Sequence, residues 1–140
     1  MLLSLYFLDT NACITWMEGR SETLLDRIAR KSRSDLAISS IAVAELHWGV
    51  VNSSRQRLES NRRRLADFLG PLEMVYFDEE AAARYAPLRL HLESTGEIIG
   101  LMDMLIAATA LANDAILVTH NVDEFSRVPG LRYEDWTIPV

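Results

Sequence analysis

The sequence predicts an α/β fold with a central, mostly parallel sheet. Short apolar runs alternate with longer segments of helical periodicity. Gly, Pro, Asn and Asp residues separate the two kinds of segment. The chain has 140 residues, 49% of them hydrophobic, which is enough to bury one sizeable core but hardly two. Because strands that alternate with helices pair in parallel under crossover connections, we expect one α/β domain over residues 1–140.

In the first half of the chain, apolar runs predict strands and periodic stretches predict helices. Residues 2–8 and 36–39 are apolar runs, so each is predicted as a strand. Ser39 and Ser40 are suitable N-caps for the helix that follows, and Gly70 with the proline after it ends the last helix of this half. The predicted helices cover 12–17, 22–31, 41–52 and 55–69.

The second half continues the alternation. Asp78 is placed to cap a helix that runs towards Ser94, and a kink is expected at Pro87. After a break at Gly100, residues 101–112 have the most regular helical pattern in the chain. The remaining strands are predicted at 72–77, 115–119 and 131–133, with a short turn or helix reaching Phe125 before the last of them.

Composition and charge argue against non-specific nucleic-acid binding, an intrachain disulfide and a membrane segment. Lys31 is the lone lysine among 14 basic residues, which face 20 acids. The net charge of −6 argues against non-specific coating of nucleic acid, although it leaves room for a local basic groove. Cys13 is the single cysteine and has no partner for an intrachain disulfide. The apolar N-terminus meets Asp9 before it is long enough for a signal or membrane segment. We therefore expect a cytoplasmic protein that does not enter the membrane.

Three carboxylates lie in segments that should be buried. Asp9 ends an apolar strand, Glu45 interrupts IAVAELHWGVV, and Asp103 interrupts GLMDMLIAATALA. Both faces of the helix that carries Asp103 are apolar, so this side chain is expected to avoid bulk water. A buried carboxylate is costly unless it is paired. Yet no Arg or Lys occurs at 36–54 or at 97–126.

A metal ion can supply the missing positive charge. Oxygen-only ligands that include carboxylates select hard cations such as Mg²⁺ or Mn²⁺. Asp9 lies just beyond the carboxyl end of the first predicted strand and Asn121 just beyond the fourth, where open α/β sheets place ligand crevices. Asp103 and Glu45, on two helices, can point into the same crevice. Such a cluster would bind a metal ion together with a phosphate-bearing substrate.

Each of these residues also has a plain structural interpretation. Asp9, Thr10 or Asn11 is suited to cap the first helix, and Asp103 complements the dipole of its own helix. Glu45 has neither role, because it lies in a helix interior. The plain interpretation therefore leaves Glu45 unexplained.

Other conspicuous residues have ordinary interpretations. The histidines have no zinc-ligand spacing and are expected as surface or core residues, and the tryptophans are expected to pack. The arginines at 62–64 predict a solvated helix face, with RNA-phosphate contact as the alternative. The histidines are His47, His91 and His120, and the tryptophans are Trp16, Trp48 and Trp136.

Five segments, taken in order, resemble the VapC-type PIN-domain toxins over essentially the whole chain. They are LDTNACI at 8–14, SSIAVAELHWGV at 39–50, IGLMDMLIAATALA at 99–112, LVTHNVDEF at 117–125 and VPGLRYEDW at 128–136. No single motif is decisive, but their order and spacing together are specific. The resemblance implies a three-layer α/β/α PIN-like fold and endoribonuclease activity with Mg²⁺ or Mn²⁺. It also implies a homodimer and a cognate VapB-type antitoxin that blocks the site.

The resemblance carries the family's metal ligands over to Asp9, Glu45 and Asp103. Two departures stand out. Leu101 occupies the position where the family usually has a proline, two residues before the helix acid. The family often has an aspartate two residues after the threonine, and here Asn121 follows Thr119. An asparagine can accept a hydrogen bond from a coordinated water but adds no charge.

Glu124 is the candidate for the missing fourth carboxylate, since a turn or short helix there can swing it towards the crevice. We therefore expect metal ligands at Asp9, Glu45, Asp103 and Glu124. Thr119 and Asn121 are expected to position water, and Glu45 is expected either to bind the metal or to orient the attacking water. The resemblance implies a 5′-phosphate and a 3′-hydroxyl as products.

Rival functions fit the sequence less well. A receiver-like signalling domain needs adjacent acids early and a lysine late, and no lysine follows Lys31. A phosphatase of the haloacid dehalogenase type needs a second aspartate where Asn11 stands. The remaining alternative is a catalytically silent PIN-like domain that acts as a binding or scaffold module. A metal-dependent cleavage assay separates that module from the enzyme.

Overall fold

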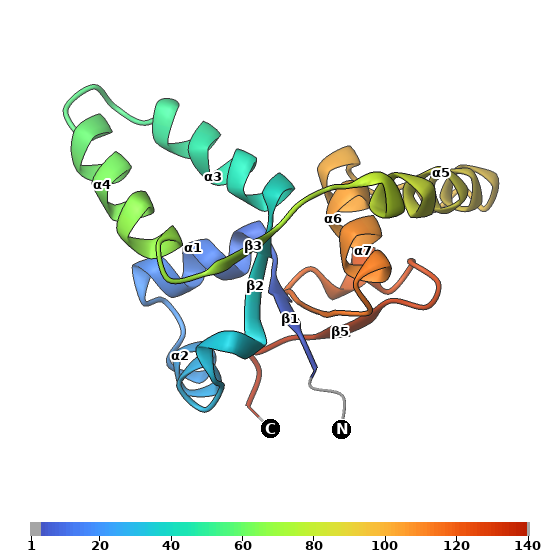
Figure 1. Ribbon diagram of the computed structural model, residues 1–140, viewed down its shortest axis with the longest axis horizontal. Coiled ribbons are helices and arrows are strands. Elements are labelled where there is room, and N and C mark those ends of the chain that lie inside the picture. The colour runs from blue at the N-terminus through green and yellow to red at the C-terminus, as the bar shows by residue number, and fades with distance from the viewer. Residues whose placement is uncertain (1–3, 140) are drawn as a thin grey trace.

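A parallel sheet runs through the middle of the computed structural model, which describes residues 4–139 (Figure 1). Its five strands lie in the order β3-β2-β1-β4-β5, and each neighbouring pair is parallel. The strands are β1 (Tyr6–Leu8), β2 (Leu36–Ser39), β3 (Glu73–Val75), β4 (Ile116–Val118) and β5 (Arg132–Glu134). The predicted α/β fold with a parallel sheet is confirmed.

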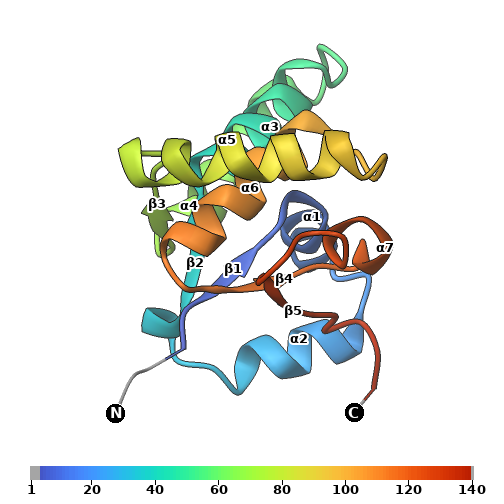
Figure 2. The same cartoon turned by 90° about the vertical axis from the view of Figure 1, so that its right-hand side faces the viewer.

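Helices cover both faces of the sheet, which gives the predicted three layers. In Figure 1, α1 and α2 lie to the left of the strands, and α5, α6 and α7 lie to the right. The pair α3 and α4 rises from the upper edge, and Figure 2 shows α5 lying across α6. The helices are α1 (Thr10–Glu18), α2 (Glu22–Ala29), α3 (Ser40–Val51), α4 (Leu58–Leu69), α5 (Glu79–Ser94), α6 (Leu101–Ala112) and α7 (Val122–Phe125).

Burial along the strands follows from their place in the sheet. Every residue of β2 and β4 is buried, as expected for inner strands that helices cover on both faces. The edge strands β3 and β5 are partly exposed. The core combines Phe7, Ile38 and Leu117 from the strands with Leu92 from α5 and Trp136 near the C-terminus. The two helical layers are thereby held to one sheet.

Several predicted boundaries are wrong by a few residues. The third strand is predicted at 72–77, but β3 stops at Val75, because its partner β2 stops at Ser39 opposite it. The fourth predicted helix starts at 55, whereas α4 starts at Leu58 after a turn, and its N-cap Arg57 makes no side-chain capping bond. The predicted helix over 22–31 ends earlier, at Ala29, and the short 3₁₀ helix at 33–35 was not expected.

Other local predictions are confirmed or refined. β2 and α6 have the predicted bounds, and α5 continues through Pro87. Ser39 caps α3 through a bond from Ala42, whereas Ser40, the other proposed cap, accepts from the backbone N–H of Phe77. The predicted strand residues 2 and 3 lie outside the described residues. Within 4–139, no helix has both the length and the apolar character required to span a bilayer.

Candidate active site

Strand pairing brings the ends of β1 and β4 together at the carboxyl edge of the sheet. Leu8 is in register with Val118, and the backbone N–H of Asp9 donates to the Val118 carbonyl at 3.0 Å. Asp9 and Thr119 follow these strands and are buried, with 4% and 1% of their surface exposed. The ends of the first and fourth strands therefore meet, and it is Thr119 that lies beside Asp9, whereas Asn121, the neighbour expected from the sequence, follows two residues later.

Asp9 combines a capping role with a place in an acidic cluster. Its Oδ1 accepts from the Ala12 backbone N–H at 2.8 Å, so it is the N-cap of α1. Burial raises the pKa of Asp9, and the charges of Glu45 and Asp135 add to this, while hydrogen bonds from Thr119 and Ala12 act in the opposite direction. The net effect is a raised pKa. The cap interpretation is correct, but it leaves a buried carboxylate without a counter-charge.

Glu45 enters the cluster from α3. The Ser39 side chain caps this helix by accepting from the Ala42 backbone N–H at 3.1 Å. Glu45 is half-buried, and its Oε1 accepts a hydrogen bond from Thr10 Oγ1 at 2.5 Å. This contact fixes α3 against the start of α1. It also gives Thr10, which the sequence analysis considered only as a cap, a direct part in the site.

Asp103 reaches the same place from α6. The side chain is half-buried at the third position of the helix, as its apolar surroundings predicted. Burial raises the pKa of Asp103 to about 7, helped by a hydrogen bond with Glu124 and by the charges of Glu124, Glu45 and Asp9. The N-cap of α6 is Gly100, which makes no side-chain capping bond, and Leu101 is the first residue of the helix. Asp103 therefore faces other acids, not a base.

The loop after β4 supplies the remaining candidates. The Asn121 backbone N–H donates to Thr119 Oγ1 at 2.9 Å, which anchors α7 to the buried threonine. Glu124, on α7, lies against Asp103, whereas Asn121 lines a hollow beside the cluster. The structure thus brings Asp9, Glu45 and Glu124 within electrostatic reach of Asp103.

The chemistry of these side chains fits a hard divalent cation, although they are not gathered around one point. All four acids offer oxygen ligands, and none of them forms an ion pair within residues 4–139. As they stand, no three acidic, histidine or cysteine side chains in the described part of the chain are arranged to hold an ion. Burial raises the pKa values of Asp9 and Asp103, and the charges of neighbouring acids add to the effect. Side-chain rotation would be needed to gather the ligands.

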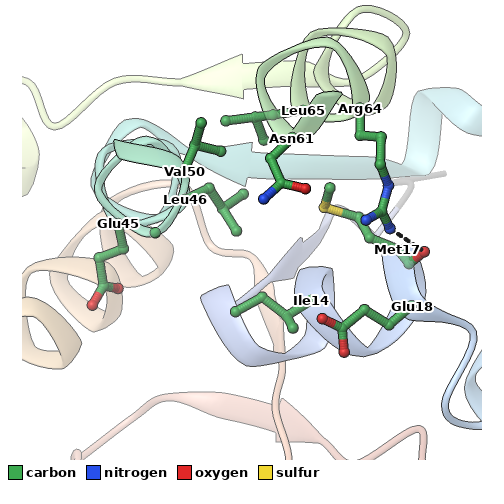
Figure 3. A pocket seen from close by; sticks show the side chains of 10 residues that line it. Ile14, Met17, Glu18, Glu45, Leu46, Val50, Asn61, Arg64 and Leu65 are labelled. Carbon is green, nitrogen blue, oxygen red and sulfur yellow. Dashed lines mark hydrogen bonds between the residues drawn. The ribbon is translucent and has the colours of Figure 1, made fainter. Parts of the chain in front are cut away.

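An apolar pocket of about 220 Å³ adjoins Glu45 between α1, α3 and α4. Figure 3 shows Ile14, Leu46 and Leu65 between Glu45 on one side and Glu18 on the other. Arg64 lines this pocket and donates to the Met17 carbonyl at 3.4 Å.

The arginines at 62–64 therefore do not share one role. Arg62 and Arg63 are exposed and pair with Glu59. Arg64 is exposed as well, but it donates to a backbone carbonyl of α1 in place of an acid on its own helix. The solvated face predicted for the run is confirmed for all three arginines.

The C-terminal segment brings in a residue that sequence reasoning missed. Val118 of β4 is in register with Glu134 of β5, so Asp135 lies beside the end of β4. Its Oδ2 is 2.9 Å from His120 Nδ1, and its charge contributes to the raised pKa of Asp9. The signal for Asp135 was its place two residues after the strand predicted at 131–133. Its position in the sequence points to the site only when it is also known that β5 pairs with β4.

Open α/β sheets bind ligands at their carboxyl edge, and unpaired acids in that place are suited to hold a metal ion that acts on phosphate esters. Residues 6–131 match the family model described as PIN domain. Ribonuclease VapC2 of Rickettsia felis is 39% identical over 133 residues, which cover 94% of this chain and 98% of that protein. The tRNA(fMet)-specific endonuclease VapC of Salmonella typhimurium is 34% identical over 94% of this chain and 97% of its own length.

Solved structures agree with these relatives. The VapBC2 complex of Rickettsia felis, bound to a DNA fragment from its promoter, contains a chain that matches with a TM-score of 0.86 and 38% identity. The match covers 94% of this chain and 98% of that one. The chain therefore belongs to the PIN-domain family, and within it to the VapC group.

Proposed function

We propose that this protein is a Mg²⁺- or Mn²⁺-dependent endoribonuclease that acts as the toxin of a type II toxin–antitoxin pair. The observation that carries the proposal is the cluster of acids at the carboxyl edge of the sheet: the pKa values of Asp9 and Asp103 are raised, and no acid of the cluster forms an ion pair within residues 4–139. The names of the relatives, a ribonuclease and a tRNA-specific endonuclease, support RNA as the substrate. The cytoplasm, where such RNA is found, is the proposed place of action.

In this mechanism Asp9, Asp103 and Glu124 would hold the cation, and Glu45 would either join them or orient the attacking water. A bound Mg²⁺ lowers the pKa of a coordinated water and stabilises charge on the leaving oxygen. Water attacks the phosphorus and the bond to the 3′ oxygen breaks, which leaves a 5′-phosphate and a 3′-hydroxyl. Thr119 fixes the loop that presents Asn121, whose amide can position water. The RNA is single-stranded or looped at the cut, because its phosphate must reach a recessed site.

The partners follow from the same comparison. Related chains were solved as VapBC complexes in Rickettsia felis and Salmonella typhimurium, so a VapB-type antitoxin is proposed for this chain, together with a homodimer. Exposed apolar side chains on α3 and around the start of α6 are available for such contacts. They are Trp48, Val51, Ile98, Leu101 and Met102.

Chelation tests the enzyme directly. EDTA should abolish RNA cleavage, and added Mg²⁺ or Mn²⁺ should restore it, because clustered carboxylates repel a phosphodiester unless a cation lies between them. The products should carry 5′-phosphate and 3′-hydroxyl ends. Cleavage that persists in EDTA would contradict the mechanism. A purified protein that never cleaves RNA with either metal would support the silent binding module.

A further inference from the structure

A hollow of about 640 Å³ adjoins the acidic cluster on the side of the α1–α2 connection and the C-terminal segment. Its walls include Asn11 and Thr15 of α1, Arg20 before α2, His120 and Asn121 after β4, and Thr137. The volume falls within the range of about 300–1,000 Å³ that is usual for ligand sites. Within the described residues, none of its lining side chains is acidic. A phosphodiester can therefore enter this hollow without repulsion from its walls, whereas the carboxylates of the neighbouring cluster alone would repel it.

His120 is held in this wall by two oxygen atoms. Its Nδ1 is 2.9 Å from Asp135 Oδ2 and 3.1 Å from Thr137 Oγ1. The Thr137 hydroxyl donates its own hydrogen to Asp135 Oδ1 at 2.6 Å. Both neighbours of Nδ1 are therefore acceptors, so Nδ1 must carry the hydrogen.

Asp135 is suited to remain an ionised hydrogen-bond acceptor for His120. Burial raises the pKa of this carboxyl, but hydrogen bonds from the Thr137 side chain and backbone and from His120 outweigh that effect, and the pKa is lowered. Only 8% of the Asp135 side chain is exposed, whereas 75% of the His120 side chain is. A nearly buried carboxylate therefore fixes the tautomer of an exposed imidazole.

With the hydrogen on Nδ1, the neutral ring presents Nε2 as a hydrogen-bond acceptor. No hydrogen bond within residues 4–139 uses Nε2. Phosphate oxygens cannot donate to it, but a hydroxyl can, and the ribose 2′-hydroxyl is the group that distinguishes RNA from DNA. Arg20, whose guanidinium also pairs with Glu18, lines the same hollow and can contact the adjoining phosphate from there.

We propose that this hollow is a ribonucleotide subsite beside the scissile position, in which Nε2 of His120 accepts a hydrogen bond from a ribose 2′-hydroxyl. The proposal rests on the proposed ribonuclease function and adds to it a residue that selects RNA. Asp135 and Thr137 are positioning residues, since they act through the His120 ring.

Binding measures this selection without cleavage. Fluorescence anisotropy would compare random-sequence 12-nucleotide pools of RNA and DNA, at about pH 8, where imidazole is neutral. Ca²⁺ would replace Mg²⁺, because it accepts oxygen ligands with looser geometry, and a gel would confirm that the RNA stays intact. The wild type should bind RNA more tightly than DNA. His120→Ala should lower that preference by about 2- to 10-fold, the range expected for one hydrogen bond, through weaker RNA binding alone.

Two further variants make the result decisive. His91→Ala removes an exposed histidine on α5 and should leave the preference unchanged. Asp135→Asn can place an amide N–H against Nδ1 and so reverse the tautomer, and it should reproduce the loss seen with His120→Ala. The inference is overturned if His120→Ala weakens RNA and DNA binding equally, if it weakens neither, or if the wild type has no preference. If the wild type does not cleave RNA with Mg²⁺ or with Mn²⁺, the proposed function itself is contradicted.

Discussion

Asp103 occupies a position where two explanations of an acid overlap. As the third residue of α6 it can interact favourably with the helix dipole. It is also half-buried beside Glu124, with Glu45 and Asp9 close enough to raise its pKa to about 7. An acid that only interacts with a helix dipole should have its charged form stabilised. The raised pKa means that the neutral form of Asp103 is stabilised instead, relative to a free aspartate. The local environment thus supports the metal-ligand role over the dipole role.

Asp103→Asn separates the two roles. We expect cleavage to fall by at least about 10- to 100-fold, the usual loss when the interactions of a metal site are disturbed. The metal-free melting temperature should stay equal or rise, because one repelling charge is removed. A dipole role predicts instead a cost of about 0.3–1 kcal/mol with cleavage intact. A destabilised but fully active variant would remove Asp103 from the site.

The pH dependence of the metal-free protein tests the same charge. Because the pKa of Asp103 rises from 3.8 to about 7 on folding, the folded state binds its proton more tightly than the unfolded state. The stability that this proton binding contributes is fully present below the pKa of Asp103 in the unfolded state. It is lost as the pH rises through the pKa of Asp103 in the folded state. Thermal melts from about pH 4 to about pH 8 should show the Asn variant gaining on the wild type as the pH rises. A difference that does not vary with pH would contradict this assignment.

At the scale of elements, the caps of α1 and α3 allow function to be separated from folding. Asp9 both caps α1 and contributes a buried carboxylate. Asn caps a helix about as well as Asp does, so Asp9→Asn should keep the melting temperature while cleavage falls by at least about 10-fold.

Ser39→Ala is the matched comparison, because it removes the cap of α3 and no charge. It should cost about 0.5–2 kcal/mol of stability and leave substantial cleavage once the protein is folded. Denaturant unfolding and a cleavage assay on both variants give the comparison. If Asp9→Asn stays fully active, Asp9 is only a cap.

Element types were predictable because the apolar runs and breakers are local properties of the chain. β2 and α6 have the predicted bounds. β3 could not be bounded in this way, since it ends where β2, its partner strand within residues 4–139, ends. The bond from Thr10 to Glu45 was equally out of reach, because it joins two helices and depends on how α3 is rotated.

At the scale of the whole molecule, the position of the site was predictable from one rule, that parallel strands present their carboxyl ends at the same edge. Asp9 and the segment after β4 meet there as that rule requires. The rule says nothing about β5, whose pairing with β4 brings Asp135 to His120. The residues of a short edge strand do not by themselves indicate which distant strand it pairs with.

The toxin role is a property of the whole molecule, because it requires both the site and a surface for the antitoxin. Expressed alone, the protein should arrest growth, and expressed with its VapB-type partner it should be tolerated. Asp103→Asn provides the matched control: produced at the same level by immunoblot, it should be tolerated without the partner. Growth curves and RNA integrity on gels are the measurements.

Each outcome of the growth experiment has a distinct meaning. Arrest by the wild type alone, relieved by either the partner or Asp103→Asn, links toxicity to the acidic cluster. Arrest by both the wild type and the variant would mean that toxicity comes from binding and not from cleavage. Normal growth and intact RNA when the wild type is expressed alone would favour the silent scaffold. The acids around Asp103 would then be unpaired carboxylates that raise its pKa without holding a metal.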